Sequence, residues 1–318
     1  MQQRKPAPVP TLADFDSFEF GRQTLYRGDC LEVMSCFREN TISGVVTDPP
    51  YALIEYHQRE QRRLRTGNRG GVWRLPPSFD GYERRPLPRF TVLSSSDRLE
   101  VYDFFVEWGA ELLRICRPGA HVFIASNTMM SPLVACAMEY AGFERRGEVA
   151  RLVRTFRGGD RPKNAEDEYS NLSTTPRSCW EPWGIYRKPI ECRTVAENLR
   201  VWKVGALKRF SKDQPFLDVI PSGLAPDEER EAAPHPSLKP QHFLRILVRS
   251  VLPLRGGIIL DPFAGAASTL AACEYLKIRG VGIELDKQYY AMAAKALPLL
   301  SELKRPQLGR RQRFLPGL

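Results

Sequence analysis

Two consecutive prolines fix the end of one predicted strand in this chain of 318 residues. They belong to Asp48-Pro49-Pro50-Tyr51, which follows the β-prone run 44–47. Because proline cannot donate to a sheet ladder and has a fixed φ, the strand must end here in a rigid loop. Open α/β sheets bind ligands at the carboxyl ends of their strands, so this loop is a candidate site. Its carboxylate and a backbone carbonyl can accept hydrogen bonds from a planar amine while Tyr51 stacks on the ring. The alternative is an ordinary turn with a surface aspartate.

Apolar patterns elsewhere alternate between strand and helix, which predicts an α/β fold with a mostly parallel sheet. Strand, helix and strand are expected at 23–27, 30–37 and 44–47, and this order implies a parallel pair. The later expected elements are a helix through 101–112 that ends at Arg117-Pro118-Gly119, a buried strand at 120–125, a helix near 131–140, and strands near 143–153 and 183–187.

The last third of the chain has the most regular pattern. Pro240 is well placed to open a helix, and residues 258–260 form an apolar strand. A turn then leads into a helix at 267–276, and the next strand, 281–283, ends at Glu284.

The net charge of +10 is concentrated in two stretches. Residues 55–89 hold nine arginines and four acids, a net +5, and residues 304–313 hold five bases and no acid, another +5. Segregated positive charge suits a polyanion such as a nucleic-acid backbone, although solvated segments with no partner are the alternative.

Cysteine and hydropathy patterns exclude several other classes of protein. The seven cysteines are scattered, with no Cys-x-x-Cys pair and only four histidines, so neither a disulfide framework nor a metal site is indicated. No apolar run approaches the roughly 18 residues of a membrane span. We therefore expect a soluble, cytoplasmic protein with no membrane partner.

An acid follows each of the last two predicted strands. The turn Asp261-Pro262-Phe263-Ala264-Gly265 joins a strand to a helix, and Glu284 ends the next strand. A carboxylate at that second position can accept from both hydroxyls of a ribose. The turn lacks the glycine pattern that binds pyrophosphate, and Asp261 would repel phosphate but favour a cationic amine. These features point to S-adenosylmethionine, with a purely structural turn as the alternative.

Seven short motifs follow one another along the chain. They are Gly28-Asp29-Cys30-Leu31, 47–51, Arg117-Pro118-Gly119, Glu181-Pro182-Trp183 to Arg187-Lys188-Pro189, His235-Pro236-Ser237-Leu238-Lys239-Pro240, 261–265 and Gly282-Ile283-Glu284-Leu285-Asp286. Their order resembles the β-class (permuted) amino-methylating DNA methyltransferases, the DNA N6-adenine/N4-cytosine methyltransferase family. The resemblance covers about residues 22–297. After Gly265 the family typically has Ser-Gly-Thr-Thr, whereas this chain has Ala266-Ala267-Ser268-Thr269.

The resemblance implies a Rossmann-like S-adenosylmethionine-dependent methyltransferase fold with a circularly permuted motif order and a small discontinuous recognition region. Residues 53–97 are expected to form a mobile basic loop that closes over DNA. The expected parts are an N-terminal arm (1–21), the catalytic half (22–190), a target-recognition region (191–233, with 191–213 reading the target), the cofactor-binding half (234–303) and a basic tail (304–318).

Carried over by position, the resemblance also implies roles for single residues. Asp48 and the Pro49 carbonyl, in the rigid loop with Pro50, would hold the target amine, and Tyr51 would stack on a base rotated out of the duplex. Asp29 would contact the adenine of S-adenosylmethionine, Glu284 its ribose and Asp261 its amino-acid end. The remaining expected cofactor-binding residues are Cys30, Lys239, Pro262, Phe263, Gly265, Ser268 and Thr269.

Adenine N6 is the favoured target, because cytosine N4 enzymes more often have Ser-Pro-Pro-Tyr at this position. Cytosine N4 methylation is the alternative, followed by methylation of RNA or of a protein amide, and by a DNA-binding subunit whose catalytic pocket has decayed. The expected partner is duplex DNA with a flipped base. A homodimer and a partner restriction endonuclease, as in restriction-modification, are left open.

Overall fold

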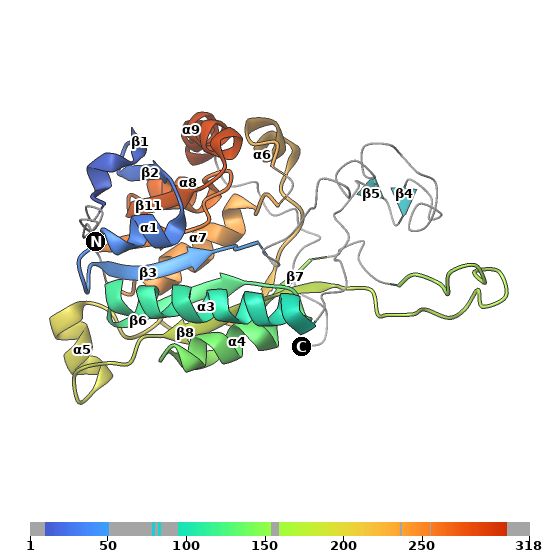
Figure 1. Ribbon diagram of the computed structural model, residues 1–318, viewed down its shortest axis with the longest axis horizontal. Coiled ribbons are helices and arrows are strands. Elements are labelled where there is room, and N and C mark those ends of the chain that lie inside the picture. Colours follow the sequence, from blue (N-terminus) through green and yellow to red (C-terminus); the bar gives the residue numbers. More distant parts are fainter. Residues whose placement is uncertain are drawn as a thin grey trace, which may run out of the picture.

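A computed structural model of the chain describes residues 10–50, 78–79, 82–83, 95–153, 159–235, 237–254 and 256–303 (Figure 1). The strands are β1 (Asp16–Phe20), β2 (Gln23–Arg27), β3 (Ile42–Thr47), β4 (Ser78–Phe79), β5 (Tyr82–Glu83), β6 (Cys116–Ala125), β7 (Glu144–Leu152), β8 (Trp180–Arg187), β9 (Val219–Pro221), β10 (Ile258–Asp261) and β11 (Arg279–Glu284). The helices are the 3-10 helix η1 (Leu12–Asp14), α1 (Cys30–Ser35), α3 (Ser95–Ile115), α4 (Ser131–Tyr140), α5 (Val195–Trp202), α6 (Asp227–Ala232), α7 (Gln241–Val251), α8 (Ser268–Tyr275) and α9 (Lys287–Glu302).

The described part of the chain forms one nine-stranded sheet in the order β1-β2-β11-β10-β3-β6-β8-β7-β9, with β4 and β5 paired separately. Five neighbouring strands, from β2 to β6, are parallel. β8 is antiparallel to both β6 and β7, and β1 is antiparallel to β2. This is the expected α/β fold with a mostly parallel sheet.

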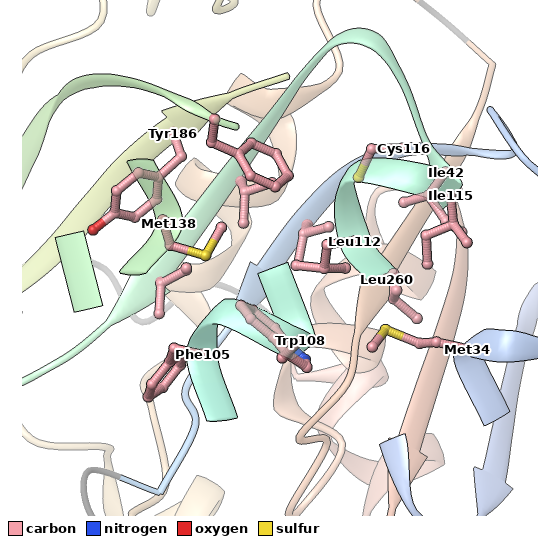
Figure 2. Close-up of a cluster of buried hydrophobic side chains, with 14 of the residues drawn as sticks. Met34, Ile42, Phe105, Trp108, Leu112, Ile115, Cys116, Met138, Tyr186 and Leu260 are labelled. Atoms are coloured by element: carbon pink, nitrogen blue, oxygen red, sulfur yellow. The ribbon is translucent and has the colours of Figure 1, made fainter. Parts of the chain in front are cut away.

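Helices cover both faces of the sheet, because successive residues of its central strands point to opposite sides. Val45 of β3 and Ile124 of β6 pack with α1, α3 and α4, in the cluster of Figure 2. Their neighbours Val46 and Phe123 pack with α7 on the other face. Burial on both faces explains why these strands have continuous apolar runs in the sequence.

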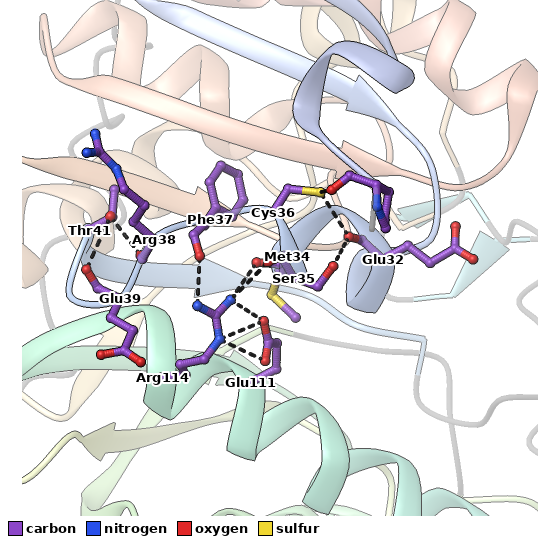
Figure 3. A network of polar contacts seen from close by, with 11 residues as sticks. Glu32, Met34, Ser35, Cys36, Phe37, Arg38, Glu39, Thr41, Glu111 and Arg114 are labelled. Carbon is purple, nitrogen blue, oxygen red and sulfur yellow. Dashed lines mark hydrogen bonds and ion pairs between the residues drawn. The ribbon is translucent and has the colours of Figure 1, made fainter. Parts of the chain in front are cut away.

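A cation at the end of α3 fixes the short helix α1. Arg114 donates to the carbonyl oxygens of Phe37, at 2.8 Å, and Met34, at 3.0 Å, and pairs with Glu111 (Figure 3). Both carbonyls lie at or just beyond the carboxyl end of α1, where helix carbonyls lack their regular partners, and Met34 O also accepts from the backbone N–H of Phe37 at 2.9 Å. Arg114 thereby ties the carboxyl end of α1 to α3.

Several expectations from the sequence need correction. β2 and β3 run in the same direction, but they are not a pair, because β11 and β10 lie between them. Residues 16–20 of the expected N-terminal arm form β1, an edge strand of the main sheet. Helix α3 begins at Ser95, inside the range expected for the mobile loop. The remainder of that loop, apart from the backbone of β4 and β5, and the tail 304–318 lie outside the described residues.

The region 191–233, which we expect to recognise the target, contributes a strand to the main sheet. Its strand β9 pairs with β7 and forms the edge of the sheet. Within the described ranges, no helix combines the length and the apolar character needed to cross a bilayer.

Candidate functional site

The strand that precedes Asp48 and the strand that ends at Asp261 are neighbours. β3 and β10 are parallel, with Leu260 opposite Val45. Their carboxyl ends therefore lie together, and Thr47 Oγ1 donates to Asp261 Oδ1 at 2.7 Å. The two candidate strand ends therefore meet in the fold, whereas Tyr51 itself lies outside the described residues.

Asp261 is a buried carboxyl group, only 4% exposed. Burial raises its pKa to about 6, and the nearby charge of Asp48 also raises it, against hydrogen bonds from Thr47, Thr269 and the Phe263 backbone N–H that lower it. Thr269 and Ser268 are buried in the first turn of α8. A carboxyl group with these properties suits a cationic partner, which would restore its charged form.

Glu284 joins a third strand end to the site. It is the last residue of β11, and its carboxylate accepts from the backbone N–H groups of Gly265 and Asp286, each at 2.8 Å. Burial raises the pKa of Glu284 to about 7, and the charges of Asp286 and Asp261 add to this effect. The hydrogen bond from Gly265 therefore joins the 261–265 turn to Glu284, although the two are separate in the sequence.

The turn itself uses two left-handed residues. Gly265 has φ +51°, and a Cβ added there would lie 3.3 Å from His235 Nε2. Ala267, at a position where the family that the sequence resembles typically has glycine, has φ +59° and is fully buried. Alanine in this conformation costs roughly 1 kcal/mol, so the departure from the family pattern adds strain at this turn.

Asp29 and Cys30 lie at the start of α1. Asp29 caps the helix, with its carboxylate accepting from Leu31 N at 2.8 Å, and the N–H of Gly28 donates to the Glu284 carbonyl at 3.1 Å. Asp29 thus lies beside the strand end that carries Glu284. Cys30 packs in the core, where burial raises the pKa of its thiol to about 12.

Phe263 faces the helix layer of α3. Its ring centroid lies 5.7 Å from Trp108 and 6.2 Å from Phe104. The aromatic side chain therefore anchors the 261–265 turn to the core and is half-exposed on its other side. Pro262 is buried next to it.

His235 is a site residue that the sequence reading did not assign. Its ring packs on Tyr289, with centroids 4.6 Å apart, and its Nδ1 accepts from Ser237 N at 3.2 Å. Burial, and then the charge of Lys239, lower the pKa of His235 to about 4, so the ring is neutral at physiological pH. With Nδ1 accepting, the proton lies on Nε2, which faces Gly265. Its position in the His235-to-Pro240 motif was the available signal.

A row of alternating charges lies behind Asp48. Lys239 pairs with Asp48 and lies 3.4 Å from Glu181 Oε1, and Arg151 Nη1 lies 2.8 Å from Glu181 Oε2. Burial alone would raise the pKa of Glu181, but Lys239 and Arg151 outweigh it and lower the pKa to about 2. Neither Glu181 nor Arg151 was assigned a role from sequence, because only the fold brings β7 and β8 beside the 235–240 segment.

Residues 193–213 do not join this edge of the sheet. Asn198 of α5 donates to the Pro118 carbonyl, at the amino end of β6, and Lys208 N donates to the Ser250 carbonyl near the end of α7. Both contacts lie at the edge opposite Asp48, so the role of 191–213 in reading the target stays a prediction. The connection between β7 and β8 does leave from the site edge, and its described part, 159–179, projects from the body (Figure 1).

A family model described as DNA methylase matches residues 42–295. The chain is 23% identical to the type II methyltransferase M.HindIII of Haemophilus influenzae, over 86% of this chain and 94% of that protein. It is 22% identical to M2.DpnII of Streptococcus pneumoniae, over 88% and 91%. Among solved structures, the cytosine-N4-specific PvuII DNA methyltransferase matches with a TM-score of 0.59 and 13% identity, over 86% of each chain. TTHA0409 of Thermus thermophilus, complexed with S-adenosyl-L-methionine, matches with a TM-score of 0.54 and 19% identity, over 88% and 96%.

Proposed function

This chain belongs to the DNA methylase family of N6 and N4 amino-methyltransferases, and we propose that it methylates the N6 amine of adenine with S-adenosylmethionine as methyl donor. The target base would be rotated out of duplex DNA, because the amine is otherwise inaccessible within the base stack. The proposal is carried by one observation, the junction of Thr47-Asp48 with the buried Asp261 at adjacent strand ends.

The residues at this junction fit S-adenosylmethionine. Glu284 has a carboxylate held by two backbone donors at a strand end, which suits hydrogen bonds from a ribose. Asp261 is a buried anion beside it, which favours an ammonium or sulfonium group and disfavours phosphate. The likeness of the fold to TTHA0409, which was solved with this molecule, supports the same choice.

The residues at the site would promote methyl transfer mainly by holding the target amine in the orientation needed for reaction. The exocyclic amine is a poor nucleophile because its lone pair is conjugated with the ring. Asp48 and the Pro49 carbonyl would each accept a hydrogen bond from it and favour the geometry in which the lone pair is free. The two prolines hold these acceptors in a fixed loop, and the side chain of Asp48 is 18% exposed, accessible from solvent. When bound, S-adenosylmethionine supplies an electrophilic methyl group.

The recognition surface is proposed to lie at the site edge, in 159–179 and in the loop after β9. Exposed Arg161 and Lys163 belong to the first of these segments, and Ser222 and Gly223 begin the second. By contrast, the bases of α5 lie at the opposite edge of the sheet.

Methyl transfer to duplex DNA tests the function directly. DNA labelled with S-adenosylmethionine carrying a radioactive methyl group is digested to nucleosides, and we expect label in N6-methyladenine. Label in N4-methylcytosine alone would overturn the choice of base, and transfer to RNA or protein but not DNA would overturn the substrate.

Asp48→Ala tests the mechanism. We expect loss of methyl transfer with unchanged affinity for S-adenosylmethionine, because Asp48 holds the target amine. Asp103→Ala, which removes an exposed carboxylate of α3, is the matched control and should retain full activity. Full activity in Asp48→Ala would contradict the mechanism.

A further inference from the structure

The row of charges behind Asp48 is secluded from solvent. The side chains of Lys239, Glu181 and Arg151 are 9%, 16% and 6% exposed. With Asp48 they form an alternating series of two anions and two cations, so the row is neutral as a whole. Lys239 lies between the two anions and forms an ion pair with each of them, so it connects Asp48 to the rest of the series.

Such a row is not explained by stability. Removing ions from water costs several kcal/mol for each, and well-packed apolar side chains often do as well or better. A buried ionic series at the predicted site of a reaction is therefore more consistent with a role in that reaction.

The end of the row that lies away from Asp48 is firmly anchored. Arg151 donates to the Gly223 carbonyl at 2.8 Å and to Ser222 Oγ at 3.0 Å, and its guanidinium lies 5.2 Å from the centroid of the Phe243 ring. Trp183 Nε1 donates to Glu181 Oε2 at 3.0 Å. Glu181 is thus fixed between β7, β8 and α7, and its other oxygen faces Lys239.

The end at Asp48 lies in a loop, beyond the last residue of its strand. Asp48 is the first residue after β3, and two prolines follow it. Lys239 reaches it from directly before α7, where Pro240 is the N-cap residue. The ammonium group therefore ties this loop to an anchored part of the fold.

We propose that Lys239 is a positioning residue for methyl transfer, whose ammonium group holds the Asp48 carboxylate in one orientation and is itself held by Glu181. This inference rests on the proposed function and differs from the role of cofactor ligand expected from sequence. In the reaction the bond from N6 to the methyl carbon forms as the bond from that carbon to sulfur breaks. The electron pair of the broken bond stays on sulfur, and the methylated nitrogen then loses one proton to water. Asp48, paired with Lys239, serves as a hydrogen-bond acceptor in this step.

Variants of Lys239 separate positioning from cofactor binding. In Lys239→Met we expect the single-turnover rate of methyl transfer to fall by about 100-fold, the loss typical of a misplaced reactive group. The Kd for S-adenosylmethionine, measured by calorimetry, should stay within about two-fold of the parent value, since this inference assigns Lys239 to Asp48 and not to the cofactor. Lys239→Arg keeps the charge and should recover part of the rate.

Two further variants control for folding and for the change in charge. Lys239→Met leaves Glu181 with one cation fewer, so Lys239→Met with Glu181→Gln removes both charges and avoids an unbalanced buried carboxylate. The double variant should bind the cofactor with the affinity of the parent protein, and its rate of methyl transfer should stay as low as that of Lys239→Met. Lys277→Gln is the matched control, because Lys277 pairs with Glu274 at the amino end of β11 and its side chain is 70% exposed. Its rate should equal that of the parent.

The outcomes distinguish the inference from the function on which it rests. The positioning role would be overturned if Lys239→Met transferred methyl groups at the rate of the parent protein. It would also be overturned if the Kd for the cofactor rose by the same factor as the rate fell. A parent protein that binds the cofactor but methylates no DNA would overturn the proposed function itself. Recovery by arginine, with slow transfer and normal cofactor binding in the double variant, would support the inference.

Discussion

At the scale of single residues, burial controls the charge of the two acids that we propose to face the cofactor. It raises the pKa of Asp261 to about 6 and that of Glu284 to about 7. When the pKa of a carboxyl group is raised in the folded state, the folded protein loses stability as the pH rises from the ordinary pKa of that group through the raised one. For Glu284 this loss falls between its ordinary pKa of 4.5 and about 7, and a ligand that hydrogen-bonds to the ionised carboxylate offsets it.

Affinity for S-adenosylmethionine should rise with pH. Because the cofactor selects the ionised form of Glu284, binding should release a proton near pH 6.5, and affinity should weaken by up to about ten-fold between pH 7 and pH 6 from this group. Calorimetry in buffers of different ionisation enthalpy measures the proton release. Glu284→Gln should abolish this part of the pH dependence, whereas Glu107→Gln, at an exposed position of α3, should retain it. The ionisation of the cofactor itself is common to all three proteins. An unchanged pH profile in Glu284→Gln would contradict the assignment.

Gly265→Ala should weaken cofactor binding. A Cβ at φ +51° is strained by about 1 kcal/mol, and it would press on His235 at 3.3 Å. We expect a lower melting temperature and a several-fold higher Kd for S-adenosylmethionine. Gly223→Ala is the control, because its Cβ would meet no described atom within 4 Å. Equal affinities in the two variants would show that this turn does not contact the cofactor.

At the scale of elements, local patterns predicted most helices and strands but not their neighbours. The strand expected at 23–27 and the helix expected near 131–140 are β2 and α4, with the same limits. Their limits could be predicted because the apolar spacing and the residues that end each element lie close together in the sequence. The partners of β3 could not be predicted, since strands buried on both faces all have similar apolar runs. The same limit applies to the site, where Asp48 and Asp261 were recognisable but the Lys239, Glu181 and Arg151 series depends on packing.

The 159–179 segment should matter more for DNA binding than α5. Replacing Arg161 and Lys163 by alanine should reduce affinity for duplex DNA and lower the slope of log Kd against log salt by up to about 2. Replacing Arg193 and Arg200, which are exposed at the opposite edge, should leave the affinity for duplex DNA and the salt slope equal to those of the parent protein within experimental error. Fluorescence anisotropy with salt titration measures the two quantities. The reverse order of effects would restore the region 191–213 as the DNA contact.

At the scale of the whole molecule, half of the excess positive charge belongs to residues 304–313. Deleting residues 304–318 should weaken non-specific DNA binding and reduce the salt slope by at most about 4 to 5, since five bases are lost. A full-length variant with these five bases changed to glutamine should behave like the deletion. If the deletion alone weakens binding, charge is not the cause. Affinity for S-adenosylmethionine should be unchanged in both.

The position of β10 and β11 between β2 and β3 also has a consequence for synthesis of the chain. When the ribosome has made only the first 250 residues, β2 and β3 each expose a row of unpaired backbone groups, and the strands that fill the gap do not yet exist. Open strand edges of this kind favour association between chains. Nascent chains of this protein should therefore depend on chaperones until residues 258–284 emerge, and products that stop before them should aggregate.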